Sequence, residues 1–258
     1  MADTNVVLYE KRDRIAYVTI NRPERMNALG RLVSEGLAKS FLDFDADPDA
    51  WVAVVTGAGD RAFCAGADLK EAADRGTFDD SERRYPLPSL SSGTFETWKP
   101  IIAAINGYAL GGGLELALSC DIRVAAEHAQ LGLPEARRGR GAGVGIHRLP
   151  RAIPIGIAKE YIFTGRHMTA QRAYELGLVN RVVPKEQLMA AAEEIANEIL
   201  ECAPLSVRWQ KENLTKGLAM PVNEAIKLRA GPDIYHMEDV LEGAKAFAEK
   251  RKPVWKGK

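Results

Sequence analysis

Short apolar runs that alternate with turns and helical patterns constrain the fold of this chain more than any other feature of its sequence. The run at 51–56 is uninterrupted and rich in β-branched residues, as is typical of a strand buried on both faces. A similar run at 101–105 passes through Asn106-Gly107 and leads into a predicted helix at 111–119. Residues 121–125 give another buried strand. This alternation predicts an α/β fold rather than a helical bundle or a β-sandwich.

The first fifty residues predict two strands and a helix. Residues 6–10 and 15–20 are β-favouring runs separated by a charged turn, which indicates a hairpin. Pro23 ends the second strand, because proline has no amide hydrogen to donate to a sheet. The residues that follow have helical spacing up to Asp47-Pro48, with apolar positions at Leu29, Leu32, Val33, Leu37 and Phe41.

From Thr169 onward the pattern becomes mostly helical. One apolar stripe, ended by Pro204, contains Leu188, Ala192, Ile195 and Ile199. Further helices are predicted at 206–218 and 240–250. We therefore expect an α/β core over residues 1–200 and a helical region over residues 201–258. The apolar faces of these helices need a partner surface, so we expect the second region to mediate homo-oligomerisation.

The composition is that of an ordinary globular protein. The hydrophobic fraction of 46% and the charged fraction of 27% are close to globular averages, which argues against disordered and disulfide-scaffold classes. The 35 basic and 35 acidic residues cancel, so no net field attracts nucleic acid or anionic membranes. The N-terminus lacks the features of a signal peptide, and no apolar run approaches the length of a membrane span. We expect a cytoplasmic protein without membrane contact.

Cysteines and histidines give no sign of a disulfide framework or a metal site. Cys64, Cys120 and Cys202 are odd in number and far apart, so we expect each to be a small buried apolar side chain. The four histidines lack the spacing that would gather them on one helical face. No metal is predicted. The glycine-rich segments match neither a P-loop nor a dinucleotide-binding fingerprint, so no nucleotide cofactor is predicted either.

Two turns rich in small residues could bring backbone amides close to a ligand. In Cys64-Ala65-Gly66-Ala67-Asp68-Leu69-Lys70-Glu71, Asp68 is a suitable helix N-cap, and Glu71 could reach back to the amide of the cap. Gly111-Gly112-Gly113 precedes a helix whose unpaired first amides favour negative charge. Glycine costs about 1 kcal/mol relative to alanine inside a helix, so three in a row indicate close backbone approach. A plain capped turn and close helix–strand packing are the alternatives.

Two glutamates lie next to these turns in the sequence. Glu115 is in the first turn of the glycine-rich helix, and Glu135 follows the apolar stretch 131–134. Two carboxylates that meet in a cleft can share a proton, so that one acts as acid and the other as base. In isolation each would more often be a helix-dipole partner or a surface charge.

Taken together, these motifs resemble those of the enoyl-CoA hydratase (crotonase) family over nearly the whole chain. The likeness is carried by Asn21-Arg22-Pro23, Asn27-Ala28-Leu29, the segments 64–69 and 111–115, the stretch 164–183, and residues 247–251. The resemblance implies a crotonase-like spiral of ββα units with a C-terminal helical region. It also implies assembly into a homotrimer or a homohexamer made of two trimers.

The resemblance further implies the roles of particular residues. A thioester carbonyl would be held by the backbone amides of Ala67 and Gly112, and Glu115 and Glu135 would be the catalytic pair. Contacts to an acyl-CoA substrate are expected from Ala65, Ala67, Asp68, Leu69, Lys70, Gly111 and Gly112, with Arg25 and Lys250 near the CoA phosphates. CoA is part of the substrate, so no separate cofactor is implied.

The expected function is reversible addition of water to a trans-2-enoyl-CoA to give a 3-hydroxyacyl-CoA. Both glutamates are present, which favours hydration over enoyl-CoA isomerisation, a reaction that needs only one. After Glu135 the loop at 139–143 lacks a proline and one residue that the family usually has.

Enoyl-CoA isomerisation is the main alternative, and two others remain. The stretch 148–154 is similar to crotonobetainyl-CoA hydratases, which keeps a carnityl-CoA dehydratase as an alternative within the family. RNA binding, known for some relatives, is the non-enzyme alternative. Neutral total charge and the lack of aromatic residues among the arginines at 137–151 argue against it.

Overall fold

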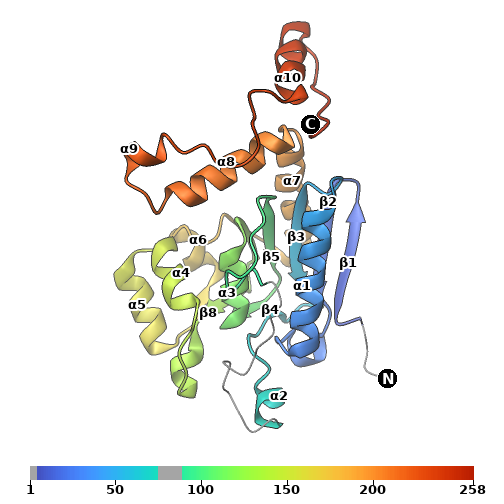
Figure 1. Cartoon of the computed structure of the whole chain (residues 1–258). Helices are drawn as coiled ribbons and strands as arrows, with labels where there is room; N and C mark the ends of the chain where they lie inside the picture. Colours follow the sequence, from blue (N-terminus) through green and yellow to red (C-terminus); the bar gives the residue numbers. More distant parts are fainter. Residues whose placement is uncertain (1–4, 75–88) are drawn as a thin grey trace.

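Two sheets form the centre of the molecule in the computed structural model, which describes residues 5–74 and 89–258 (Figure 1). Across the larger sheet the strands are β1 (Val7–Arg12), β2 (Ile15–Ile20), β3 (Val52–Gly57), β5 (Ile101–Ile105), β7 (Ile122–Ala126) and β10 (Arg181–Val183). Across the smaller sheet they are β4 (Ala62–Cys64), β6 (Tyr108–Leu110), β8 (Gln130–Gly132) and β9 (Met168–Thr169). The predicted hairpin is confirmed, because β1 and β2 pair antiparallel.

The chain repeats one path through both sheets. Each pass uses a strand of the larger sheet, a short strand of the smaller sheet and then a helical segment. The passes are β3, β4 and α2 (Leu69–Asp74), then β5, β6 and α3 (Gly112–Ser119), then β7, β8 and the 3-10 turn η2 (Pro134–Arg138). Successive passes pair in parallel in both sheets. The predicted spiral of ββα units is confirmed.

Side chains of the larger sheet alternate between two hydrophobic cores, one on each face. In β2, Ala16, Val18 and Ile20 belong to one core, whereas Ile15 and Tyr17 belong to the other. Successive side chains of a strand point to opposite faces, so a strand covered on both sides must be apolar throughout. This explains the uninterrupted apolar runs in the sequence.

Helices α1 (Arg31–Ala46) and α7 (Leu188–Leu200) pack on these two cores. The predicted stripe of α7 is largely confirmed, with Leu188, Ala192 and Ile195 buried. In α1 the buried stripe is Val33, Leu37, Phe41 and Phe44. The inclusion of Leu32 in that stripe was wrong, since Leu32 precedes Val33 by one position, about 100° around a helix, and is 46% exposed.

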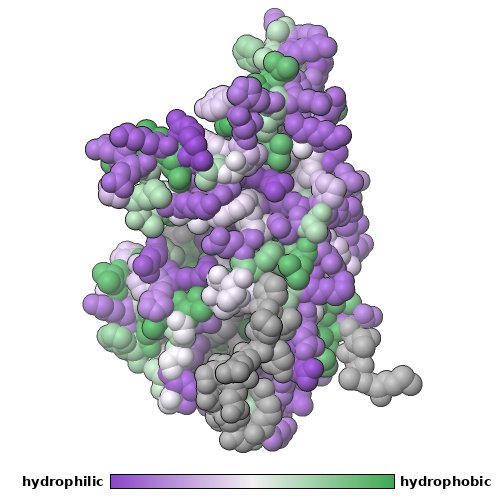
Figure 2. All heavy atoms as spheres, in the orientation of Figure 1, coloured by the Kyte–Doolittle hydropathy of each residue, from purple (hydrophilic) through white to green (hydrophobic). Residues whose placement is uncertain are grey.

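The C-terminal helices extend from one end of the sheets (Figure 1). They are α8 (Pro204–Gly217), α9 (Val222–Ala225) and α10 (Glu238–Glu249). The end of the chain folds back onto α10, where Asp239 accepts hydrogen bonds from the amides of Lys256 (2.8 Å) and Gly257 (2.9 Å). Figure 2 shows apolar residues scattered among hydrophilic ones over this end of the molecule. The large apolar side chains that remain exposed on these helices are Leu214, Leu218, Val222, Leu241 and Phe247.

Several elements were not predicted from the sequence. The strands of the smaller sheet have two or three residues each and are too short to show a periodicity. Helices α4 (Gly145–Ala152) and α5 (Ile155–Thr164) were missed, and α4 contains Pro150 and follows a glycine-rich stretch. Helix α6 (Ala170–Glu175) lies in the part expected to be helical. The expectation that all cysteines are buried was wrong for Cys202, which is exposed just beyond the end of α7.

Within residues 5–74 and 89–258, no helix is both long enough and apolar enough to cross a membrane. The same ranges contain no group of three or more His, Cys, Asp or Glu side chains that could hold a metal ion.

Gly113 sets how closely α3 approaches the smaller sheet. A Cβ atom on Gly113 would lie 2.0 Å from the carbonyl oxygen of Cys64 in β4, so no larger residue fits without moving the helix. Close packing of a helix on a strand therefore explains one glycine of the Gly111-Gly112-Gly113 run.

Gly113→Ala and Gly156→Ala form a matched pair of substitutions in helices. We expect Gly113→Ala to destabilise the protein by about 3 kcal/mol or more, because the added methyl group meets backbone. At Gly156 in α5 an added Cβ meets no described atom within 4 Å, and helix propensity predicts a gain of up to about 1 kcal/mol. Denaturant titration followed by circular dichroism measures both. Unchanged stability of Gly113→Ala would contradict the close approach.

Candidate active site

Three adjacent strands of the smaller sheet end at the candidate site. β4, β6 and β8 run parallel, so their carboxyl ends lie at one edge with roughly 4.8 Å between neighbouring strands. The chain continues from these ends into Ala67, into Gly111-Gly112 and into Glu135, respectively. Parallel pairing therefore collects residues that are far apart in the sequence.

The turn after β4 is paired with residues 26–29. Ala65 donates its amide to Met26 O (3.1 Å), Leu29 donates to Gly66 O (2.7 Å), and Asp68 donates to Leu29 O (3.1 Å). In such a parallel bridge between Leu29 and Ala67, the polar groups of Ala67 itself point away from Leu29. The Ala67 amide has no hydrogen-bond partner among the described residues. This amide can donate to a ligand.

The turn after β6 presents a second amide. Gly111 adopts φ 54° and ψ −125°, a conformation open in practice to glycine alone. Gly112 is the first residue of α3, so its amide has no partner within the helix and none in the rest of the described chain. A Cβ atom on Gly66 would lie 3.2 Å from Gly112 N, so the two turns contact each other. Two unpaired amides on contacting turns are a suitable donor pair for an oxyanion.

Glu115 is fixed by the start of α4. Its Oε1 accepts hydrogen bonds from the amides of Val144 (3.0 Å) and Gly145 (2.7 Å). A Cβ atom on Gly112 would lie 3.9 Å from Glu115 Oε2, which places this oxygen beside the first turn of α3. One carboxylate oxygen is therefore held, and the other lies near Gly112.

Glu135 is in a different environment. Its Oε2 is buried and has no hydrogen-bond partner among the described residues, and a Cβ atom on Gly111 would lie 2.7 Å from its Oε1. Burial raises the pKa of the Glu135 carboxyl above its ordinary value, and the charge of Glu115 raises it further. A hydrogen bond from its own backbone and the charge of Arg140 act in the opposite direction. The raised pKa favours the protonated form of Glu135, and the structure brings both predicted glutamates to one place.

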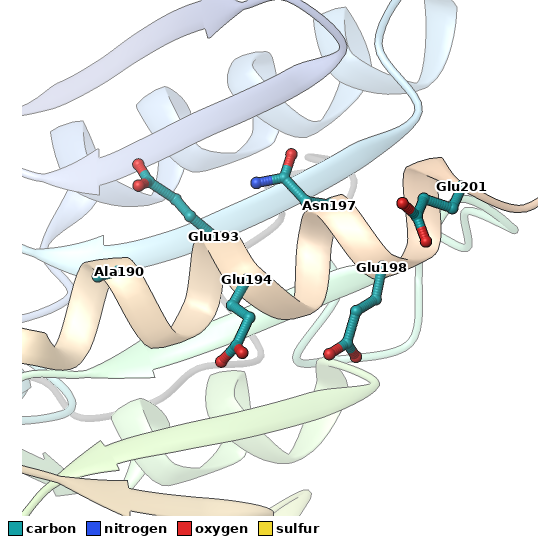
Figure 3. Close-up of a pocket in the computed structure, with 6 residues that line it drawn as sticks. All are labelled: Ala190, Glu193, Glu194, Asn197, Glu198 and Glu201. Atoms are coloured by element: carbon teal, nitrogen blue, oxygen red, sulfur yellow. The ribbon is translucent and has the colours of Figure 1, made fainter. Parts of the chain in front are cut away.

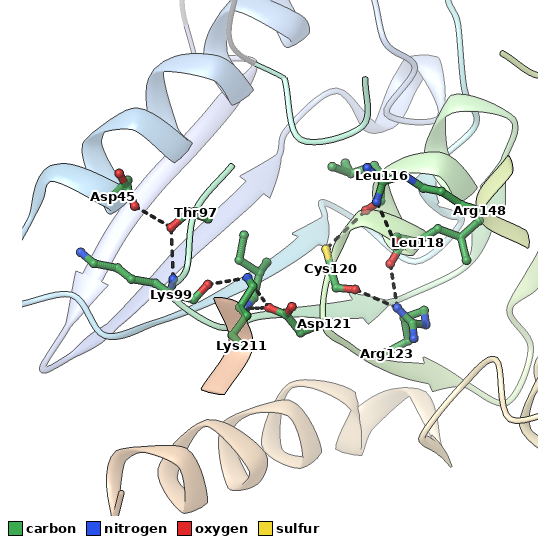
Figure 4. A network of polar contacts seen from close by, with 12 residues as sticks. Asp45, Thr97, Lys99, Leu116, Leu118, Cys120, Asp121, Arg123, Arg148 and Lys211 are labelled. Carbon is green, nitrogen blue, oxygen red and sulfur yellow. Dashed lines mark hydrogen bonds and ion pairs between the residues drawn. The ribbon is translucent and has the colours of Figure 1, made fainter. Parts of the chain in front are cut away.

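Two arginines hold the far end of α3 (Figure 4). Arg123 donates to the carbonyl oxygens of Cys120 (2.9 Å) and Leu178 (2.6 Å), and Arg148 donates to Leu118 O (3.4 Å). Cations at a helix C-terminus satisfy its last carbonyl groups and complement its dipole. Sequence analysis did not predict this role, because neither arginine is next to α3 in a recognisable motif.

Of the remaining predicted residues, Asp68 and Glu71 lie together at the start of α2. Asp68 caps α2, with its Oδ1 accepting from the amides of Lys70 and Glu71, both at 3.1 Å. The predicted return contact from Glu71 to the Asp68 amide was wrong. That amide is already bonded to Leu29 O, and Glu71 Oε1 instead accepts from Arg31 N (3.2 Å).

The basic residues expected near CoA phosphates lie in different parts of the molecule. Lys70 and Leu69 are exposed at the start of α2, and Arg25 is exposed in the 3-10 turn η1 (Pro23–Arg25). Lys250 caps the end of α10, at the opposite end of the molecule from α2 in Figure 1. One chain therefore does not bring Lys250 to the other predicted contacts. The sequence between Glu71 and Pro100 is polar and turn-rich, which predicts a long loop that could form part of the substrate pocket. Residues 75–88 of this stretch lie outside the described residues.

A shallow groove of about 570 Å³ lies on α7, away from the glutamate pair (Figure 3). Its lining is Ala190, Glu193, Glu194, Asn197, Glu198 and Glu201. Several of these carboxylates already have partners: Arg181 pairs with Glu194 and Glu198, and Lys252 pairs with Glu201. This groove is an ion-paired helix surface, and its residues are not candidates for catalysis.

The chain is similar to known proteins over nearly its whole length. Residues 10–258 match the Enoyl-CoA hydratase/isomerase family. The carnitinyl-CoA dehydratase of Salmonella typhi is 43% identical over 252 residues, which cover 95% of each chain. The crystal structure of an enoyl-CoA hydratase from Bacillus anthracis is 38% identical, with a TM-score of 0.89 over 98% of this chain and all of that one. An enoyl-CoA hydratase from Mycobacterium tuberculosis is 40% identical, with a TM-score of 0.87 over 98% of this chain and 99% of that one.

Glu135→Gln should stabilise the protein in a pH-dependent way. A carboxyl whose pKa is raised by folding contributes stability at low pH and loses that contribution as the pH rises through the raised pKa. We expect the variant to melt roughly 2–4 °C above the wild type near pH 8, with a smaller difference near pH 5. Glu198→Gln, on the exposed side of α7, is the control. Equal differences at both pH values would contradict a raised pKa for Glu135.

Proposed function

Because the chain belongs to the enoyl-CoA hydratase/isomerase family, we propose that it is a hydro-lyase that interconverts a trans-2-enoyl-CoA and a 3-hydroxyacyl-CoA. One observation carries the proposal. A hydrogen-bonded carboxylate, Glu115, and a buried unpaired carboxyl, Glu135, lie beside two unpaired backbone amides. Water addition needs a base, an acid and an oxyanion site together, and this arrangement supplies all three.

The amides of Ala67 and Gly112 would bind the thioester oxygen. As water adds to Cβ, the electron pair of the double bond moves toward this oxygen and gives an enolate. Hydrogen bonds aimed at the developing charge stabilise the transition state more than the ground state. One such donor is typically worth about 3 kcal/mol of barrier.

The two glutamates would move the protons. The carboxylate of Glu115 takes a proton from water as the water oxygen attacks Cβ, and Glu135 gives its proton to Cα. At the end of the turnover Glu115 carries the proton and Glu135 is ionised, and exchange with solvent restores the starting state. The raised pKa of Glu135 supports its assignment as the acid, because burial favours its protonated form. No cofactor takes part in this proposal, since CoA belongs to the substrate.

Two acyl groups have support as substrates. The structural relatives described above are titled enoyl-CoA hydratases, which favours a simple enoyl chain. The relative at 43% identity is named a carnitinyl-CoA dehydratase, which favours the same water elimination with a trimethylammonium group on Cγ. We propose the simple enoyl-CoA as the first candidate and the carnitinyl-CoA pair as the second. The expected location in the cytoplasm stays a prediction from the sequence.

Purified protein should hydrate crotonyl-CoA or crotonobetainyl-CoA, measured as loss of the ultraviolet absorbance of the enoyl thioester with chromatographic identification of the product. We expect Glu115→Gln and Glu135→Gln each to lower kcat by about 10³-fold, because each removes a proton-transfer group. Glu198→Gln in the α7 groove should leave kcat unchanged. Conversion of a 3-enoyl-CoA that survives one of the two active-site changes would instead favour an isomerase.

The same assay run across pH tests the assignment of the pair. Both directions need the pair to hold one proton in total, and the overall equilibrium involves no proton. The values of kcat/KM for hydration and dehydration should therefore follow one bell-shaped pH profile. Different profiles for the two directions would contradict a shared proton.

We further propose that α8–α10 mediate homo-oligomerisation, with a trimer or a hexamer as the expected state. Leu241 is 74% exposed and Phe247 is 87% exposed on α10, and water contact with such side chains is unfavourable. Leu241→Asp and Phe247→Asp should shift the mass measured by light scattering toward the monomer. Leu42→Asp, an exposed apolar position on α1, is the control. A monomeric wild type would refute the proposal.

A further inference from the structure

Arg22 and Asp68 form a partly buried ion pair next to the Ala67 turn. Arg22 Nη1 lies 2.8 Å from Asp68 Oδ2, and the Asp68 side chain is only 5% exposed, the least of any carboxylate in the ion pairs of residues 5–74 and 89–258. Sequence motifs singled out both residues, but the reaction proposed above gives Arg22 no part. We therefore considered what the pair does for the site.

Asp68 is held through its side chain and its main chain at once. Oδ1 caps α2, Oδ2 binds Arg22, and the amide nitrogen donates to Leu29 O. The Ala67 amide lies in the same peptide group as Gly66 O, which accepts from Leu29 N (2.7 Å), and Asp68 holds Ala67 from its other side. The orientation of the Ala67 amide therefore depends on both anchors, and Asp68 is the one that Arg22 fixes. Loss of the Arg22 contact would free one side of this residue.

Arg22 is itself anchored. Its amide donates to Asn27 Oδ1 (2.9 Å), and the fully buried Asn27 donates to the carbonyl oxygens of Ala58 (3.0 Å) and Ala62 (2.7 Å). A Cβ atom on Gly30 would lie 3.1 Å from Arg22 Nη1, so glycine leaves room for the guanidinium group. The frame around Arg22 therefore reaches β4, the strand that leads into the Ala67 turn.

Arg22 also helps to keep the Asp68 carboxyl ionised. Burial alone would raise the pKa of Asp68, but the Glu71 amide and the charges of Arg22 and Arg25 outweigh burial and keep the pKa below its ordinary value. A buried carboxylate that loses its paired cation is strongly destabilised. Without Arg22, Asp68 would favour protonation or movement, and either change would disturb the turn.

We propose that Arg22 is a positioning residue, which fixes Asp68 and thereby keeps the Ala67 amide directed at the thioester oxygen. The inference rests on the proposed role of Ala67 as an oxyanion donor and extends it to the residue that holds this donor in place. Arg22 acts through Asp68 and does not touch the reacting atoms. Its loss therefore affects the transition state more than substrate binding.

The first test separates kcat from KM. We expect Arg22→Gln to lower kcat by about 10²-fold, because a misplaced donor costs about that much, while KM changes by less than about threefold. Arg22→Lys keeps the cation and should retain an intermediate kcat. A rise in KM with unchanged kcat would overturn the proposal, since it would indicate that Arg22 contacts substrate.

The second test is rescue by a second change. In Arg22→Gln combined with Asp68→Asn no buried charge is left unpaired, and asparagine still caps a helix. The double variant should recover at least about tenfold in kcat over Arg22→Gln. In Arg22→Gln alone, protonation of Asp68 should lower the activity at acid pH. The double variant has no carboxyl at position 68, so this acid-side decrease should be absent. A double variant no better than the single one would overturn the proposal.

The third test does not depend on turnover. A bound cinnamoyl-CoA absorbs at longer wavelength when hydrogen bonds polarise its thioester carbonyl. We expect this shift in the wild type, a smaller shift in Arg22→Gln, and the full shift in Lys211→Gln. Lys211 also forms a partly buried ion pair, with Asp121 (2.7 Å), but remote from the turn. If Arg22→Gln fails to fold, the absorbance shift is compared between the wild type, Arg22→Lys and the double variant instead.

The outcomes distinguish the two proposals. A shift in the wild type without turnover of any enoyl-CoA would contradict the proposed reaction and leave the role of Arg22 intact. Equal shifts in the wild type, Arg22→Gln and Arg22→Lys would overturn the role of Arg22 even if hydration is observed.

Discussion

Parallel pairing of β4, β6 and β8 is the constraint on which the rest of the site depends. Each strand has only three residues, yet the three carboxyl ends place Ala67, Gly112 and Glu135 on neighbouring turns. The larger sheet makes this possible, because β3, β5 and β7 pair in the same order and their apolar side chains fill two cores. Burial on both faces of one sheet therefore fixes the geometry of the other.

Half of the candidate site consists of backbone amides, and glycine residues give the backbone the conformation and close packing that expose them. Gly113 lets α3 lie against Cys64, and Gly111 takes a conformation that turns the chain into the helix with the Gly112 amide unpaired. The other unpaired amide follows from the bridge between Leu29 and Ala67. Neither amide contributes a hydrogen bond to the fold among the described residues, so both are open to a ligand, as the proposed function requires.

The two glutamates differ because their surroundings differ. The start of α4 donates two amides to Glu115, whereas Glu135 keeps one buried oxygen without a partner among the described residues. A buried carboxyl without a partner lowers stability, and in the proposed mechanism this carboxyl is the proton donor. Arg22 and Asp68 show the opposite arrangement, a partly buried pair in which the carboxylate has its own cation next to the Ala67 turn.

The sequence by itself determined the α/β class, the hairpin, the α7 stripe, the Asp68 cap and the two glutamates, because period, capping chemistry and glycine runs are local properties. The contact expected from Lys250 stays a prediction, because a single chain places Lys250 at the opposite end of the molecule from α2 (Figure 1). The sequence did not reveal the smaller sheet, α4 or the pairing of Glu71 with Arg31. Only the tertiary structure decided these, since strands of two or three residues and contacts between distant segments depend on long-range packing that no local pattern records.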